Sequence, residues 1–272
     1  MTKRNGKLNL TQKQKAFRKA LKAAPFIGLT LVSGLAVAAE KESSKGVWQA
    51  GLALATVDAA YKGRNRDNYV FPVLGYESER LYFRGIELGY RLLSSRSQEL
   101  AIVSGIGGKR FDPKKNNNAE LQQLDKRDFR LETGLKFTQR TPYGRFTAES
   151  RVNVRDFDTG YQSTLGYFYS FSPSPRQWQL GPRLDVSYVS GSYTDYFYGI
   201  SQAEAGRSGL SAYDSNSSWN VAISLEGFVR LNERWSLAGT IKRSFLDDAI
   251  RNSPMTEGSH ANSAFIIINY RL

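Results

Sequence analysis

The sequence contains no cysteine, and His260 is the single histidine among its 272 residues. Without cysteine, a small secreted domain held together by disulfide bonds is excluded, and so are thiolate zinc sites. Because the acidic residues are scattered among arginines and lysines, we expect no metal site and no cofactor. Stability must therefore come from packing or from a β-sheet that closes on itself.

Acidic residues are missing from the first 22 positions, which carry eight of the basic residues behind the formal net charge of +13. An apolar stretch, 25–39, follows and ends in small residues, the order typical of a secretory signal peptide. An attached amphipathic helix is less favoured, because the run is short for a membrane span and ends in an Ala-x-Ala pattern. We predict a cleaved signal peptide over 1–39, with cleavage after Ala38 or Ala39, and one domain over 40–272.

Long apolar runs are also lacking: none of 18 or more residues follows Ala39, so we expect no transmembrane helix. The remaining basic residues alternate with acidic ones, unlike a one-faced basic patch with stacking aromatics, so we expect no nucleic-acid partner.

Polar and apolar residues instead alternate along the chain with a period of two. In YGRFTAESRVNVRDF (143–157), alternate positions hold charged residues such as Arg151, while the intervening ones are mostly apolar, such as Val152. Such segments are half-polar β-strands.

Two environments fit half-polar strands: a soluble sandwich or lipocalin-like barrel with an apolar interior, and a transmembrane barrel with an apolar exterior. The strands run for about 10–14 residues, whereas strands of soluble proteins average about 5–6. Aromatic residues also concentrate near strand ends, as in the girdles of membrane barrels. They are Tyr143, Phe157, Tyr161, Phe171, Trp178, Tyr188, Trp219, Trp235, Phe245 and Tyr270. We therefore predict an all-β, closed antiparallel transmembrane barrel in contact with outer-membrane lipid, since lipid offers no partner to an open edge.

The connections alternate in length, as periplasmic turns and external loops do. Short turns lie at 94–98, 141–144, 172–176 and 232–234, and longer polar stretches at 111–127, 156–160, 190–217 and 246–262. The preferred count is ten strands, at 47–57, 80–92, 99–110, 128–140, 144–155, 161–171, 177–189, 218–231, 234–245 and 263–272. A count of twelve also fits if 68–78, which contains Pro72, and 193–200 form strands.

The polar parity of these strands forms a ladder of charged residues that faces the lumen. Its members are Arg130, Glu132, Lys136, Arg145, Glu149, Arg151, Arg155, Arg183, Asp185, Glu226, Arg230 and Lys242. The ladder fits either an anion-favouring pore or a plug of mutually paired charges. The plug is favoured, because about ten strands enclose little free lumen, whereas porins use about sixteen to eighteen.

The C-terminal segment NSAFIIINYRL places four residues on one parity before the chain stops: Ile266, Ile268, Tyr270 and Leu272. This pattern resembles the recognition signal of the outer-membrane barrel assembly machinery, which most often ends in phenylalanine. Leu272 departs from that pattern. We predict that this segment is an assembly signal and that the assembly machinery is a partner.

Candidate catalytic residues are few. The segment GSH (258–260) with Asp247 and Asp248 contains the residue types of a Ser/His/Asp set, but adjacency in sequence does not give triad geometry, and a solvated loop tip is favoured. GIGG (105–108) before Lys109 lacks the Gly-Lys-Ser/Thr ending of a phosphate-binding loop. We therefore predict no catalytic residue and no enzyme activity.

Three blocks carry a family resemblance: VFPVLGYESERLYFRGIELGYRL (70–92), DYFYGISQAEAGRSGLSAY (195–213) and SFLDDAIRNSPMTEGSHANSAFIIINYRL (244–272). They resemble the MipA/OmpV family of outer-membrane proteins. The resemblance implies a barrel in the outer membrane without established enzymatic activity. One member of that family is a scaffold that joins a murein lytic transglycosylase to a penicillin-binding synthase, and others are immunogenic, osmotically regulated or adhesive surface proteins.

The resulting hypothesis is a non-enzymatic outer-membrane scaffold for peptidoglycan-remodelling enzymes, with a lytic transglycosylase and a penicillin-binding protein as partners. Two alternatives stay open. One is a narrow channel for small polar or anionic solutes. The other is a surface adhesin or receptor that acts through 190–217 and 246–262.

Overall fold

A computed structural model describes residues 46–58, 60–64, 66–107, 110–155, 159–172 and 177–272. The predicted signal peptide, 1–39, lies outside the described residues. The strands are β1 (Val47–Asp58), β2 (Arg66–Glu77), β3 (Leu81–Arg84), β4 (Glu87–Ser94), β5 (Gln98–Gly107), β6 (Arg130–Thr141), β7 (Gly144–Asn153), β8 (Tyr161–Phe168), β9 (Trp178–Val189), β10 (Ser218–Arg230), β11 (Trp235–Phe245) and β12 (His260–Arg271).

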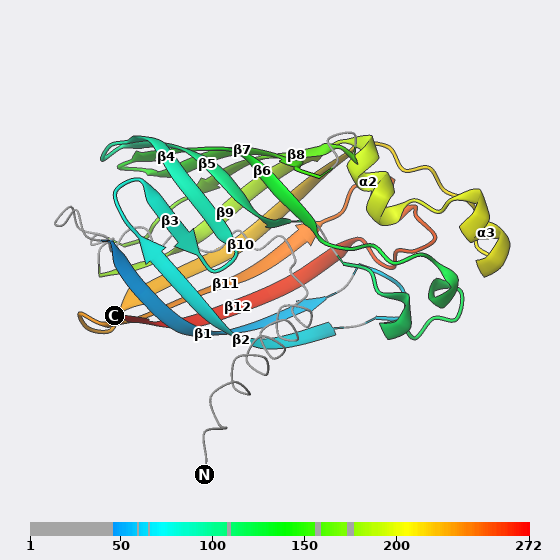
Figure 1. Cartoon of the computed structure of the whole chain (residues 1–272), viewed down its shortest axis with the longest axis horizontal. Coiled ribbons are helices and arrows are strands. Elements are labelled where there is room, and N and C mark those ends of the chain that lie inside the picture. Colours follow the sequence, from blue (N-terminus) through cyan, green and yellow to red (C-terminus); the bar gives the residue numbers. More distant parts are fainter. Residues whose placement is uncertain (1–45, 59, 65, 108–109, 156–158, 173–176) are drawn as a thin grey trace, which may run out of the picture.

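These strands form a closed barrel in which each strand pairs antiparallel with the next and β1 pairs with β12 (Figure 1). The predicted fold class is confirmed. Within the described part of the chain the barrel has twelve strands, the larger of the two numbers that the sequence allowed, so the preferred ten is two short. Residues 68–78 lie mostly in β2, and 80–92 divides at Gly85 into β3 and β4. By contrast, 193–200 lies mostly in a helix, α2 (Gly191–Tyr198), and not in a strand.

Pro72 lies on β2, where only one side of the strand is fully paired. β1 pairs with β2 along its whole length, whereas β3 pairs only with Gly75, Tyr76 and Glu77. The Gly85 N–H donates to the Leu74 carbonyl, so the backbone groups of Leu74 point away from β1. Residues two apart on a strand direct their backbone groups to the same side. Pro72, two residues earlier, therefore directs its missing N–H away from β1. Proline is tolerated in a sheet at such an edge.

Side chains alternate between the two faces of the sheet, with apolar ones outside and polar ones inside, the reverse of a soluble barrel. On β6, Leu131 and Leu135 point outward and are exposed, while Arg130, Glu132 and Lys136 are buried. An exterior that is apolar and an interior that is ionic fit a barrel embedded in lipid.

Aromatic pairs lie near the two ends of the outer surface. Trp235 and Tyr270 have ring centroids 4.9 Å apart near the C-terminus, and Tyr188 and Trp219 lie 5.1 Å apart near the opposite end. Such pairs form the girdles at the membrane–water boundaries of a barrel. The end with the C-terminus and the tight turns is called here the short-turn end, and the opposite end is called the loop end.

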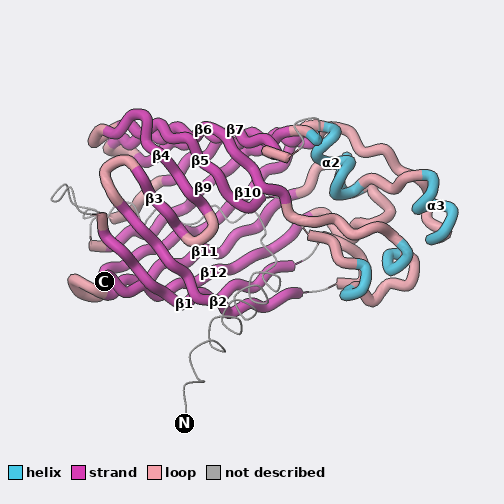
Figure 2. The backbone as a smooth tube through the Cα atoms, in the orientation of Figure 1, coloured by secondary structure: helices cyan, strands magenta, loops and turns pink. Residues whose placement is uncertain are grey.

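The long connections at the loop end fold into a packed structure, called here the external cap. Figure 2 shows its short helices beyond the strand ends. It contains α2, α3 (Gln202–Ser208), α4 (Asp248–Arg251) and two 3-10 turns, η2 (Pro113–Lys115) and η3 (Leu121–Gln123). Its core is Ala60, Tyr61, Phe111, Leu121, Leu124, Val189, Tyr193, Phe197, Tyr198, Ile200, Leu246, Ile250 and Met255. In the described ranges, no helix is long and apolar enough to cross a membrane.

Candidate functional site: the charged interior and the short-turn end

A first group of interior charges joins β4, β6 and β7. Lys136 Nζ lies 3.3 Å from Glu87 Oε1 and 3.4 Å from Glu149 Oε2. The Arg151 guanidinium binds both of these carboxylates. Two cations therefore neutralise two anions, and each partner is mostly buried. The alternation of the strands places these side chains inward, and closure of the sheet brings them together.

A second group joins β7, β9, β10 and β11. Arg145 Nη2 lies 3.2 Å from Glu226 Oε2, although β7 and β10 are not neighbouring strands. Arg183 lies 2.7 Å from Asp185 and 3.7 Å from Glu226. Lys242 Nζ lies 4.0 Å from Asp185 Oδ2. The group thus bridges the interior of the barrel.

Two ladder residues, Arg130 and Glu132, meet the external cap. The Tyr193 hydroxyl of α2 donates to Glu132 Oε1 at 3.0 Å. The Arg130 guanidinium lies over the rings of Tyr193 and Tyr196, at 4.6 and 4.1 Å from their centroids. The cap is therefore attached to the interior charges by both a hydrogen bond and cation–π contacts.

The two remaining ladder residues lie at strand ends. Arg155 follows β7 and is exposed, and its backbone N–H donates to Asn153 Oδ1 at 3.2 Å. Arg230 ends β10 at the short-turn end and is half-buried. The structure thus places ten of the twelve predicted residues in the contacts described above and the other two at strand ends.

A third group, on β2 to β5, was missing from the predicted ladder. Glu77 binds Arg84 and Arg91, and Arg91 also lies 3.1 Å from Glu99. The Arg84 and Arg91 guanidiniums lie 4.0 and 4.7 Å from the centroid of the buried Tyr82 ring. The alternation in GIELGYRLL (85–93) puts Arg91 and Glu87 of the first group on the polar parity, which indicates that both face the interior.

Part of the interior wall is apolar, a feature that was not predicted from the sequence. It is formed by β1, β2 and β10 to β12, with Tyr69 and Phe71 packed against its buried core. That core consists of Ala53, Ala55, Val73, Phe228, Ala238, Phe265 and Ile267. The interior therefore contains an apolar cluster beside its charged groups, and β2, β10 and β11 contribute residues to both.

The predicted C-terminal signal lies along the closing seam of the barrel. β12 pairs with β1 from Ser263 to Arg271. Ile266 and Ile268 point outward and are exposed, the Tyr270 ring packs on Trp235, and the Leu272 N–H donates to the Trp48 carbonyl at 3.0 Å. The role of this segment in assembly stays a prediction.

The catalytic candidates occupy structural positions. His260 begins β12 and is exposed, with its Nδ1 3.4 Å from Ser259 Oγ. The Asp247 carboxylate instead caps α4 by accepting from the Ala249 N–H at 2.8 Å, and it accepts from the Trp219 N–H at 3.0 Å. Among the described residues, no hydrogen bond joins His260 to Asp247, and no group of three metal-ligating side chains occurs.

The short-turn end exposes basic and aromatic side chains. Its turns carry Arg80, Arg96 and Arg234, all exposed, and Arg271 lies beside the last of them. Tyr143, at the tip of the β6–β7 turn, is 76% exposed. This surface combines these arginines and a large exposed aromatic group with the exposed Glu79 and Glu233 of the same turns.

A closed barrel with an apolar exterior, aromatic girdles and an ionic interior defines an outer-membrane β-barrel protein. The family model of the MltA-interacting protein MipA matches residues 50–272, so this chain belongs to that family. It is 28% identical to the putative outer membrane protein YiaT of Escherichia coli K12, over 93% of this chain and 96% of the relative. It is 27% identical to the MltA-interacting protein of the same strain, over 87% and 95%.

A third relative, the outer membrane protein OmpV of Vibrio cholerae, is 20% identical over 88% of this chain and 95% of its own length. Among solved structures, the outer membrane channel DcaP of Acinetobacter baumannii has a TM-score of 0.36 at 9% identity, over 84% of this chain and 96% of that chain. The predicted family and the predicted location in the outer membrane are both confirmed.

Proposed function

We propose that the chain is a non-enzymatic outer-membrane scaffold whose short-turn end binds a murein lytic transglycosylase and holds it near a penicillin-binding synthase. The observation that carries this proposal is membership of the MipA family over residues 50–272. A relative named MltA-interacting protein aligns over 95% of its length, which supports the same partner class.

The geometry of the short-turn end supports a protein partner. Short turns face the periplasm in bacterial barrels, where peptidoglycan enzymes work. Arginine and tyrosine are enriched at protein interfaces, and this end exposes Arg96, Arg234 and Tyr143. An acidic surface on the enzyme would complement it and would speed association.

The two alternatives are supported less. A channel needs an open path, whereas the interior charges bind one another and the cap packs over the loop end. An adhesin would act through the cap, whose segments 190–217 and 246–259 are held by a common core and not extended as free loops. Lipid hydrolysis that His260→Ala abolishes would contradict the non-enzymatic assignment.

Site-specific photo-cross-linking in intact envelopes tests the scaffold. A photoreactive residue at Tyr143 or Leu231 should capture a murein lytic transglycosylase, identified by mass spectrometry, whereas the same residue at Ala203 of the cap should not. The charge reversals Arg96→Glu and Arg234→Glu should each weaken capture by about 0.2–1 kcal/mol, and more at low salt. Arg207→Glu in the cap is the matched control.

The scaffold proposal fails if the turn sites capture no cell-wall enzyme in barrels that have folded. It also fails if Ala203 captures the same enzyme as efficiently, because contact would then not depend on the short-turn end.

A further inference from the structure

Four polar side chains form a continuous row across β11, β12, β1 and β2 at the loop end. Arg243 Nε donates to Asn262 Oδ1 at 2.8 Å, and Asn262 Nδ2 donates to Asp58 Oδ2 at 2.8 Å. Arg66 Nε then donates to Asp58 Oδ1 at 2.9 Å. By strand alternation all four point outward, on the same face as Ile241. They are called here the polar row.

The polar row carries more positive than negative charge, and its cations lie at its two ends. Arg66 and Arg243 flank a single carboxylate, Asp58, and the Arg66 side chain is 60% exposed. Three strand spacings separate β11 from β2, so the two arginine positions lie roughly 14 Å apart along the row. On β9 and β10 the loop end instead carries the aromatic pair Tyr188 and Trp219. The row therefore supplies an anion-binding arc at the level of the external headgroups.

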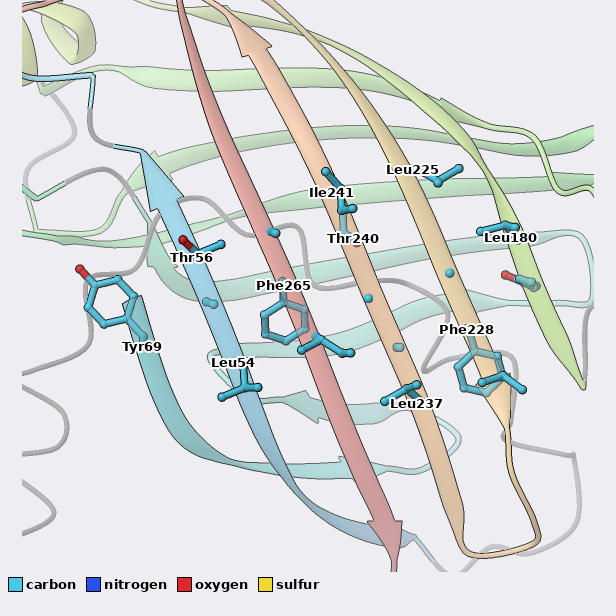
Figure 3. A pocket seen from close by; sticks show the side chains of 18 of the residues that line it. Leu54, Thr56, Tyr69, Leu180, Leu225, Phe228, Leu237, Thr240, Ile241 and Phe265 are labelled. Atoms are coloured by element: carbon cyan, nitrogen blue, oxygen red, sulfur yellow. The ribbon is translucent and has the colours of Figure 1, made fainter. Parts of the chain in front are cut away.

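An apolar groove lies on the same outer surface, towards the membrane centre (Figure 3). Its volume is 840 Å³, within the roughly 300–1,000 Å³ of small-molecule sites. Gly227 and Gly239 face each other in the β10–β11 register, and both line the groove. Ile241 lines the groove two residues from Arg243, and Ala264 does so two residues from Asn262. Two residues of strand measure about 7 Å, so the groove begins directly below the polar row.

We propose that the polar row and this groove together bind a phosphorylated, acylated disaccharide glycolipid of the outer leaflet. One phosphate binds Arg243 and a second binds Arg66, which a disaccharide with a phosphate at each end can bridge. Asn262 lies between them and faces the sugar. Acyl chains fill the groove, where the missing side chains of Gly227 and Gly239 leave room for them.

Native mass spectrometry of the full chain in detergent, with diphosphorylated lipid A as the probe, tests this site. The wild-type barrel should retain one lipid A. Arg66→Ala and Arg243→Ala should each lower the affinity about fivefold, and the double variant about 25-fold, since a basic residue near an anionic surface contributes about that factor. Arg251→Ala, an exposed arginine of the cap, is the matched control and should leave binding unchanged.

A second variant tests the groove with both arginines present. A Cβ at Gly227 would meet Leu180 Cδ1 at 3.6 Å, an ordinary contact, so Gly227→Leu can be accommodated while its side chain enters the groove. It should reduce lipid A binding by at least the factor seen for one arginine. Folding of every variant is checked by the heat-dependent gel shift of intact barrels.

Two results would overturn the proposal. In the first, the folded double arginine variant and Gly227→Leu both bind lipid A as the wild type does. In the second, phosphatidylglycerol, which has a single phosphate, competes equally well for the same place. Removing one phosphate from lipid A should instead make binding insensitive to one of the two arginine substitutions.

Discussion

At the scale of single residues, the interior is governed by the cost of burying charge. Charges removed from water are tolerated when each has a partner, and losing one partner leaves the other uncompensated. Glu226 is 5% exposed and accepts from Arg145, with Arg183 3.7 Å away. Arg145 therefore depends on this carboxylate, whereas Arg183 also lies 2.7 Å from Asp185.

Glu226→Gln should lower the free energy of unfolding by about 3–5 kcal/mol, because it leaves the buried Arg145 without its counter-charge. The measurement is the urea midpoint of the gel shift that separates folded from unfolded barrel. Glu233→Gln, the same change in an exposed turn, should stay within about 0.5 kcal/mol of the wild type. Equal midpoints for both variants would show that the interior charges are screened by water.

Sequence alternation was sufficient to place residues such as Arg145 and Glu226 on one face of their strands. It was not sufficient to pair them, because they are 81 positions apart and their strands are not neighbours. Such a contact depends on the curvature of the closed sheet. The group around Tyr82 was missed for another reason, because Glu77 lies on a strand that the preferred count left out.

At the scale of elements, the missed strands have physical causes. β3 has four residues, too few to show a period of two, and the turn that separates it from β4 depends on Gly85 with φ 67°. β2 contains Pro72, which argues against a strand paired on both sides, and the sequence could not show that one edge is free there. Polar and apolar residues alternate only weakly in 193–200. Most of this segment lies in α2, which places the aromatic side chains of Tyr193 and Phe197 in the core of the cap.

Gly85→Ala should destabilise the barrel by about 1 kcal/mol, because a side chain is strained at positive φ. Gly75→Ala, the same change in neighbouring β2, meets atoms no closer than 3.5 Å and should have a smaller effect. Urea midpoints of the two variants provide the comparison. A larger loss for Gly75→Ala would contradict the assignment of the turn to Gly85.

The cap contains a carboxylate that links its stability to pH. Burial tends to raise the pKa of Glu204, but hydrogen bonds from the Asp125 and Ser201 backbone and from Arg127 outweigh it and hold the pKa at about 2, below the usual 4.5. Its stabilising effect is therefore complete above about pH 4.5 and is lost as the pH falls towards 2. Hydrogen exchange of cap amides, corrected for intrinsic rates, should accelerate in that window. Glu204→Gln should remove the pH dependence there, and an unchanged dependence would assign it to another group.

At the scale of the whole molecule, the loop end, the interior and the short-turn end differ in character. The cap is attached to the charged interior through Tyr193 and Glu132, and the charges bind one another down to Arg91 and Glu99. The interior charges are therefore paired with one another along the barrel, and the short-turn end exposes arginines. Family membership and these paired charges are the basis of the proposed binding role.

Pairing of the interior charges predicts that the wild-type barrel gives no stepwise conductance in planar bilayers. Twelve strands enclose far less space than the roughly sixteen to eighteen of open porins, and the charges that line this space are held by one another. Arg183→Glu would place a third anion beside Asp185 and Glu226 without opening a path, so it should also remain silent. Conductance steps in the wild type, with an anion preference that Arg183→Glu or Arg151→Glu reverses, would instead make the ladder the lining of a channel. Transport alone requires no partner at the short-turn end. In that case only capture of a murein lytic transglycosylase at Tyr143 or Leu231 would support the scaffold.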